Sequence, residues 1–130
     1  MEVPFAAGAV VYARDIDRVS RFYAQLAGLP VVQETADFIV VESACFQLVV
    51  VAVPPAIAQR ITVASPPVRR EDTAFKLCLA VPAIGAARAT AERLGGMLDS
   101  AEREWEFQGV RVCDGHDPEG NVIQVRARER

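Results

Sequence analysis

The chain has 130 residues, of which 52% are hydrophobic and 24% charged, and its formal net charge is −3. A chain of this length buries roughly two thirds of its unfolded surface, which is enough for one core without disulfide or metal support. The composition therefore excludes a disordered or collagen-like chain. The weak acidity, without a basic stripe, argues against nucleic acid as a partner, because phosphates attract clustered Lys and Arg.

Apolar runs such as residues 46–53 are much shorter than the about 20 residues that cross a bilayer, so we expect no membrane partner. The first residues lack a charged segment followed by an apolar export segment. Cys45, Cys78 and Cys113 form an odd set without C-x-x-C spacing, which indicates reduced thiols, most simply half-buried on strands. Together these features predict a cytoplasmic protein.

The first half of the chain predicts a strand, a helix and three further strands. Residues 10–13 are β-branched and aromatic, and Asp15 is a candidate N-cap for a helix over residues 17–27, whose apolar positions recur at spacings of three and four. Gly28 and Pro30 end that helix. Short apolar stretches at residues 31–33, 38–42 and 45–53 then predict three strands.

Prolines and charges separate this half from the next. The pairs at residues 54–55 and 66–67 exclude a central strand, although one helical turn is predicted at residues 56–61. The charge run at residues 69–72 predicts a solvated linker that neutralises itself. The same signals then return, as a strand over residues 75–81, a helix over 83–94, and strands at 97–98, 104–107, 110–113 and 122–126.

The two halves repeat each other. Leu26 and Leu94 differ by 68 positions, as do Gly28 and Gly96, so the first strand and the helix of each half superpose without a gap. Residues 46–48 resemble residues 123–125 at an offset of 77, which predicts about nine extra residues in the later hairpins. We therefore predict a single α+β domain over residues 1–130, made of two tandem βαβββ modules at residues 1–53 and 74–130 with a linker at residues 54–73.

Several motifs resemble the vicinal oxygen chelate superfamily, which includes glyoxalase I, extradiol dioxygenases and the bleomycin-resistance proteins. They are residues 11–18 (VYARDIDR), 22–23 (FY) and 26–30 (LAGLP) in the first half, and residues 80–82 (AVP), 94–96 (LGG) and 117–123 (DPEGNVI) in the second. The last motif is the most specific, and the resemblance covers nearly the whole chain. Ala83 departs from it, because the family often has an acidic helix cap at that position.

The resemblance implies that the two modules form an incomplete barrel around a cleft. In metal-dependent members, the first strand of each module supplies a His or Gln and the last strand supplies a Glu. The corresponding positions here are Gly8, Lys76, Gln47 and Gln124, which offer two amides, an ammonium group and, at Gly8, no ligand atom. Because a divalent site for this chemistry needs imidazole and carboxylate ligands, we expect no metal and no other cofactor.

Side chains alternate along strands, and this alternation selects the residues that face the cleft. The predicted ligand-binding side chains are Tyr12, Gln47, Lys76, Trp105, Gln124 and Arg126. Each glutamine either bonds to a neighbour or awaits a ligand, and Lys76 either extends to water or orients an anionic or carbonyl-bearing ligand. Tyr12 and Trp105, with Phe107, are either aromatic walls for a flat ligand or part of the core or an interface.

Asp114, His116 and Asp117 lie close together beside a glycine-containing turn. Such spacing is typical of Asx turns, in which carboxylates cap backbone amides. His116 is the chain's one histidine, so it is the first general acid or base to test if the protein is an enzyme. We place it in a turn at the rim of the cleft.

These observations predict a metal-independent protein that binds a small organic molecule, similar in logic to the bleomycin-resistance branch. The alternative is an enzyme, either a metal-free lyase or isomerase that uses His116 or Lys76, or a lyase or dioxygenase with a divergent metal site. A third interpretation is a subunit whose cleft serves interaction only. The resemblance also implies a homodimer, since metal-free members of the family commonly complete their clefts between chains.

Overall fold

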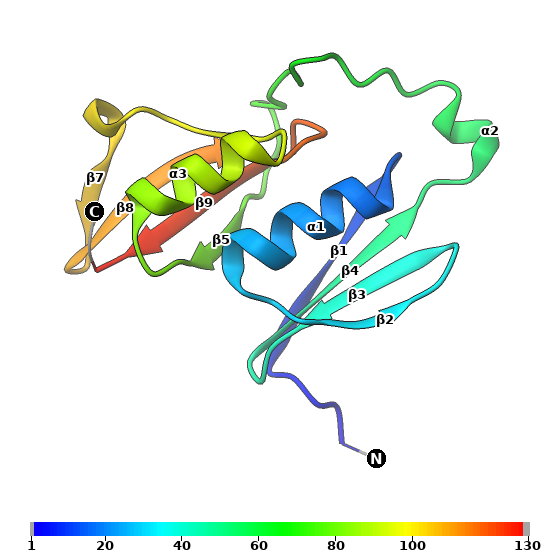
Figure 1. The fold of residues 1–130 in the computed structure, drawn as a ribbon, viewed down its shortest axis with the longest axis horizontal. Helices are drawn as coiled ribbons and strands as arrows, with labels where there is room; N and C mark the ends of the chain where they lie inside the picture. The colour runs from blue at the N-terminus through cyan, green and yellow to red at the C-terminus, as the bar shows by residue number, and fades with distance from the viewer. Residues whose placement is uncertain (1, 129–130) are drawn as a thin grey trace. The chain divides into compact units, whose positions relative to one another are not determined.

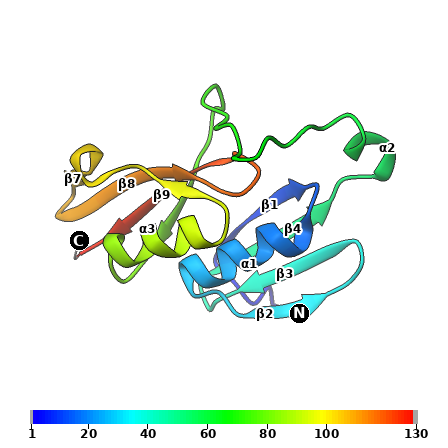
Figure 2. The same ribbon diagram turned by 45° about the horizontal axis from the view of Figure 1, so that its top comes forward.

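The computed structural model describes residues 2–128, which divide after residue 62 into two compact units. Each unit contains one mixed β-sheet and one long helix that lies across a face of that sheet (Figures 1 and 2). Among the described residues, no helix has the length and apolarity that a membrane span requires.

The first unit begins with β1 (Ala7–Ala13) and α1 (Ile16–Ala27), followed by β2 (Val31–Glu34), β3 (Phe38–Glu42), β4 (Phe46–Ala52) and the short α2 (Pro55–Ala58). The strand order is β1-β4-β3-β2, and β1 runs parallel to β4. Asp15 caps α1 by accepting a hydrogen bond from the backbone N–H of Arg18 at 3.1 Å. Gly28 ends the helix in the left-handed conformation that favours glycine, at φ 65°.

The second unit contains β5 (Leu77–Ala80), α3 (Ile84–Arg93), β6 (Met97–Leu98), the 3-10 turn η1 (Ala101–Arg103), β7 (Trp105–Phe107), β8 (Val110–His116) and β9 (Val122–Ala127). The strand order is β5-β9-β8-β6, β5 runs parallel to β9, and β7 also pairs with β8. The two sheets therefore share one topology, which confirms the two βαβββ modules. The extra residues predicted for the later half lie in the β6–η1–β7 segment and in the β8–β9 hairpin.

Each sheet has one face covered by its helix and one face that no helix of its own unit covers, which we call the open face. In the first unit, buried residues of β3 and β4, such as Val41 and Leu48, pack against α1. In the second, Ile123 and Val125 pack under α3, whose buried positions include Ile84 and Ala91. Because strand side chains alternate, the neighbours of these core residues belong to the open faces.

The three thiols are free, and Cys78 and Cys113 lie on strands as predicted, but none of the three is half-buried and Cys45 is not on a strand. Cys45 is exposed in the turn before β4, and Cys78 is exposed on the open face of the second sheet. Cys113 is completely buried on β8, on the side that faces α3. Burial raises the pKa of the Cys113 thiol despite the nearby Arg88, so this cysteine is not an activated nucleophile.

Candidate functional site

Polar side chains cross the open face of the second sheet. The register pairs Asp114 of β8 with Gln124 of β9 and Gln124 with Cys78 of β5, so these three side chains share the open face. Two positions further along, Val112 pairs with Arg126. The alternation that predicted a common face for Gln124 and Arg126 is therefore confirmed.

Hydrogen bonds link four of these side chains into a row, which we call the polar row: Lys76, Asp114, Gln124 and Arg126. Lys76, which immediately precedes β5, donates to Oδ2 of Asp114 at 2.9 Å. Gln124 donates its amide N–H to Oδ1 of Asp114 at 3.1 Å, and Arg126 Nε donates to Oε1 of Gln124 at 2.9 Å. Each member thus has its position fixed by the next, as a pre-organised binding surface requires.

Two aromatic side chains lie beside the polar row. Trp105 and Phe107 on β7 pair with Val112 and Val110 of β8, so both belong to the open face, where 39% and 46% of their surfaces are exposed. The guanidinium carbon of Arg126 lies 5.1 Å from the centre of the Phe107 ring, which is a cation–π contact. The second unit therefore places flat apolar surface next to charged hydrogen-bond donors.

The remaining two predicted residues lie on the open face of the first sheet. Gln47 donates a hydrogen bond to Glu42 at 2.7 Å, and its backbone pairs with that of Gly8. Tyr12 is 65% exposed on the same face. Both predicted glutamines are therefore bonded to neighbouring side chains in this structure.

The donor atoms do not fit the metal site of metal-dependent members. Gly8 on β1 pairs with Gln47 on β4, and Cys78 on β5 pairs with Gln124 on β9. If the two glutamines occupy equivalent positions in the two modules, the counterpart of Gly8 is Cys78 and not, as the sequence predicted, Lys76. Cys78 takes that place, which offers a thiol instead of imidazole, and the carboxylate positions hold amides that already bond to protein groups. Within residues 2–128, the His, Cys, Asp and Glu side chains form no group of three or more that could hold a metal ion.

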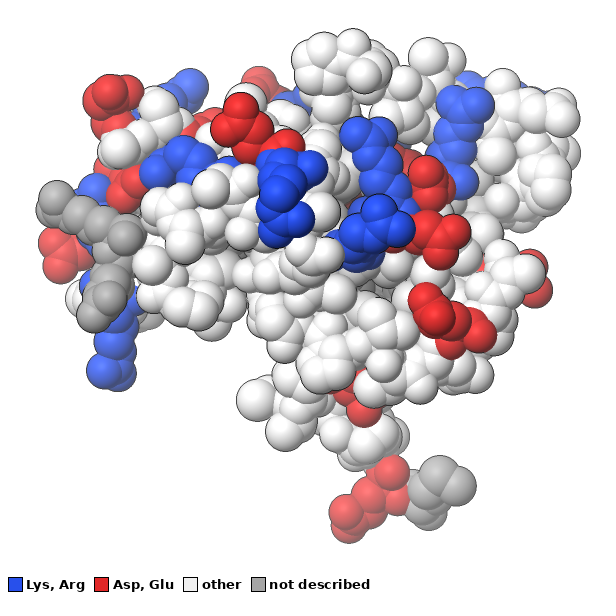
Figure 3. Space-filling model, in the orientation of Figure 1, with Lys and Arg blue, Asp and Glu red and all other residues white. Residues whose placement is uncertain are grey.

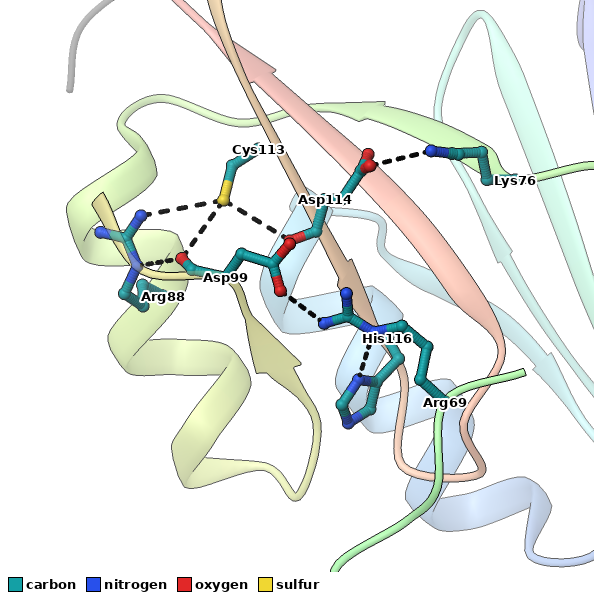
Figure 4. Close-up of polar contacts among 7 residues, drawn as sticks. All are labelled: Arg69, Lys76, Arg88, Asp99, Cys113, Asp114 and His116. Atoms are coloured by element: carbon teal, nitrogen blue, oxygen red, sulfur yellow. Dashed lines mark hydrogen bonds and ion pairs between the residues drawn. The ribbon is translucent and has the colours of Figure 1, made fainter. Parts of the chain in front are cut away.

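His116 is not in a turn at the rim, as predicted, but is the last residue of β8 and only 6% exposed. Its Nδ1 accepts a hydrogen bond from Nε of Arg69 at 3.0 Å, and Arg69 also forms an ion pair with Asp99 at 2.8 Å (Figure 4). Burial lowers the pKa of His116 and the charge of Arg69 lowers it further, which favours the neutral ring. Because Nδ1 accepts the hydrogen bond from Arg69, the proton of the neutral ring is on Nε2. The turn prediction failed because β8 continues three residues beyond the apolar stretch that marked it.

The same ion pair corrects the prediction that residues 69–72 form a solvated linker. Arg70, Glu71 and Asp72 are exposed, but Arg69 turns inward to His116 and Asp99. The backbone N–H of Arg70 donates to the carbonyl of Gly120 at 2.8 Å, which holds the segment against the β8–β9 hairpin. No local pattern reveals this arrangement, because the partners are 30 and 47 positions apart in the chain.

The two aspartates beside His116 have different roles. Asp117 is completely buried and accepts hydrogen bonds from the backbone N–H groups of Glu119 and Asn121 at 2.8 and 3.0 Å, which confirms the Asx-turn interpretation for this residue. For Asp114 that interpretation is wrong, because its carboxylate belongs to the polar row.

A buried ion-pair cluster on the helix side of the second sheet was not predicted. Glu104, whose side chain is only 4% exposed, accepts hydrogen bonds from Arg88 of α3 and Arg111 of β8. Arg88 also donates to the carbonyl of Asp99 at 2.8 Å and contacts the sulfur of Cys113 (Figure 4). The cluster joins α3 to the sheet, and its charges are separated in sequence, so no motif indicates it.

Lowering the pH is expected to reduce the free energy of unfolding below pH 6.5, the ordinary pKa of histidine. The unfolded chain then takes up a proton that folded His116 resists, so stability falls by at most about 1.4 kcal/mol per pH unit until the lower folded-state pKa is passed. Urea unfolding followed by Trp105 fluorescence between about pH 5 and 8 measures this slope. His116→Asn retains an acceptor but cannot titrate, and an equal slope in that variant would contradict the assignment.

Comparison with known proteins agrees with this architecture. Residues 8–126 match the family model described as Glyoxalase-like domain, whereas no curated protein matches. A glyoxalase/bleomycin resistance protein/dioxygenase family enzyme from Burkholderia phytofirmans PsJN has a similar structure, with a TM-score of 0.67 and 19% identity over 92% of this chain and 95% of that one.

Two further structures show the same fold. The bleomycin resistance determinant encoded on transposon Tn5 has a TM-score of 0.53 and 18% identity over 92% of this chain and 94% of its own. Oxidase ChaP-H2 has a TM-score of 0.60 and 19% identity over 98% and 95%, respectively. Since the family model spans nearly the whole chain, this protein belongs to the glyoxalase-like domain family and thus to the vicinal oxygen chelate superfamily.

Proposed function

We propose that this protein binds a small, flat, anionic organic molecule on the open face of the second sheet, without a metal ion. The observation that carries the proposal is the polar row beside two exposed aromatic rings. Lys76 donates one N–H to Asp114, and Arg126 donates its Nε–H to Gln124. The other N–H groups of both side chains have no protein partner among residues 2–128. Such donors suit a carboxylate or a polarised carbonyl.

The aromatic rings define the other half of the ligand. Trp105 and Phe107 present partly exposed faces next to Arg126, so a flat ring can stack there while its anionic group reaches the cations. Metal independence is supported by the donor set, because amides and a thiol occupy the positions that would need imidazole and carboxylate.

Trp105 is the chain's one tryptophan, so its fluorescence reports ligand directly. We expect a screen of aromatic carboxylates to yield saturable quenching, and the matching methyl esters to bind more weakly. Arg126→Gln and Lys76→Gln should each weaken binding by roughly 1–3 kcal/mol, about one to two decades in Kd. Arg70→Gln removes an exposed charge outside this face and should leave affinity unchanged.

Three results would contradict the proposal. They are the absence of any saturable quencher, equal affinity in the Arg126 and control variants, and stoichiometric nickel, zinc or iron in protein purified without chelator. Chemical conversion of the bound compound, detected by mass spectrometry, would favour the enzymatic alternative over binding alone.

We further propose that the protein is a homodimer. Support comes from the open face of the first sheet, where Val10 and Tyr12 are 57% and 65% exposed beside other apolar side chains. An isologous contact would remove this surface from water. Sedimentation at micromolar concentration should give twice the chain mass of 14.1 kDa, and a monomer alone would contradict the proposal.

We also infer that the protein acts in the cytoplasm and binds neither nucleic acid nor membrane. The three thiols are free, as expected in a reducing compartment. On the face shown in Figure 3, Lys and Arg lie among Asp and Glu and do not form a surface of one sign, which a phosphate backbone would require.

A further inference from the structure

The second unit contains a pocket of about 230 Å³ at the junction of β8 and β9 with two loop segments. One wall is the segment of residues 69–73, and another is η1 with Asp99 before it. The charged side chains that line it are Arg69, Glu71, Lys76, Asp99, Arg103 and Asp114. Equal numbers of cations and anions make this pocket unsuitable for an ion of either sign alone.

Four of these six charges are already paired. Arg69 lies 2.8 Å from Asp99, and Lys76 lies 2.9 Å from Asp114. Within residues 2–128, the side chains of Glu71 and Arg103 form no hydrogen bond or ion pair, with each other or with any neighbour. One carboxylate and one guanidinium therefore remain available, on opposite segments of the pocket wall.

The wall that carries Glu71 is held in place. Arg69, two residues earlier, bonds to His116 and Asp99, and Arg70 donates to the carbonyl of Gly120. Thr73 donates its hydroxyl to the carbonyl of Phe75 at 3.1 Å, which leaves its oxygen as an acceptor beside the pocket. These contacts hold the backbone on both sides of Glu71 in place before any ligand arrives.

We propose that this pocket binds a small zwitterion of the size of a free α-amino acid. The ligand's carboxylate would accept hydrogen bonds from the planar fork of Arg103, and its ammonium group would donate to Glu71. The pocket is smaller than the 300–1,000 Å³ typical of drug-sized ligands, which limits the ligand to a few heavy atoms beyond the two charged groups. Lys76 and Asp114 line this pocket and also belong to the polar row, but Glu71 and Arg103, which carry the inference, do not, so the inference goes beyond the proposed function.

The test is an NMR titration of 15N-labelled full-length protein with each standard L-α-amino acid. We expect at least one to give saturable shifts of the backbone amides of Glu71, Thr73 and Arg103. Its N-acetyl derivative, which lacks the cation, and its decarboxylated amine, which lacks the anion, should each bind about tenfold more weakly or worse. Arg103→Gln and Glu71→Gln should each weaken binding of the amino acid by a similar factor.

Matched controls for both charges lie on either side of Glu71. Arg70→Gln and Asp72→Asn neutralise exposed charges of the same signs that do not line the pocket, and both should bind like the unmodified protein. Because Arg103 and Glu71 are exposed, their variants should fold, which a circular dichroism spectrum checks. The proposal is overturned if no amino acid gives saturable shifts up to about 10 mM, if the N-acetyl derivative binds equally well, or if the controls lose as much affinity as the test variants. Quenching of Trp105 by aromatic carboxylates is expected to be unchanged in Arg103→Gln and Glu71→Gln, because neither residue belongs to the polar row, so the two proposals can fail independently.

Discussion

Replacing Glu104 by alanine is expected to destabilise the protein by about 3 kcal/mol, because it leaves two partly buried guanidinium groups without the buried carboxylate that they share. The Glu104 side chain is 4% exposed and is shared by Arg88 and Arg111. Nε of Arg111 is already buried without a hydrogen-bond partner. The loss of Glu104 would also remove the acceptor of the Arg111 Nη2 group. Urea unfolding followed by Trp105 fluorescence measures the change, since Trp105 is the next residue in the chain.

The pH dependence of the same group gives a second readout. Burial by itself would raise the pKa of Glu104, but the hydrogen bonds and charges of Arg88 and Arg111 outweigh it and hold the pKa below its ordinary value. A lowered folded-state pKa means that the stabilisation is complete above the unfolded pKa of about 4.3 and is lost as the pH falls through the folded value. Glu106→Ala, at an exposed position two residues away, should change stability by less than about 0.5 kcal/mol. Equal effects of the Glu104 and Glu106 variants would show that the cluster does not stabilise the fold.

Replacing Asp117 by alanine is the other change with a large expected effect, about 2–4 kcal/mol. One of its oxygens accepts from two backbone N–H groups, and the other accepts from the side-chain amide of Asn121 at 2.8 Å. Alanine would leave these donors unsatisfied in a hairpin where residues 117–120 are buried. The loss of a buried acceptor costs the full desolvation of its donors, which is why the effect exceeds that of an ordinary hydrogen bond.

The matched control is Asp114→Ala, three residues earlier in the chain, on β8. The Asp114 side chain is 27% exposed, and its partner Lys76 is 45% exposed, so water can replace much of the lost ion pair. We expect this variant to lower the free energy of unfolding by about 1 kcal/mol or less. If Asp114→Ala proves as costly as Asp117→Ala under the same urea assay, the distinction between a functional and a structural aspartate in this hairpin is wrong.

Local signals account for what could be predicted of the fold. The helix expected at residues 17–27 is α1, one residue longer at its start, because Asp15 and Gly28 act on backbone groups only a few residues away. The strand expected at residues 38–42 is β3 without change. The offset of 68 positions predicted the shared topology, since a repeated order of apolar stretches and helix stops is visible without any knowledge of contacts.

The candidate site was predictable only in part. Alternation placed Gln124 and Arg126 on one face, which the pairing with Asp114 and Val112 confirms. The parallel register of β5 on β9 was not predictable, because no turn joins parallel strands and no local pattern fixes their offset. That register sets Cys78 instead of Lys76 beside Gln124, and so changes which group stands at the position of a metal ligand.

The sequence alone therefore determined the elements, their repetition and the direction of alternate side chains, all of which depend on interactions within about one helical turn or one strand. Tertiary structure decided the partners of the charged groups. Arg69 turns from an apparently solvated run to His116, and Glu104 joins α3 to β8, across sequence separations of 47 and 16 residues. Desolvation is the physical reason, because a charge that becomes buried on folding is stable only beside an opposite charge. The topology determines which opposite charge lies nearby, and the order of residues along the chain does not.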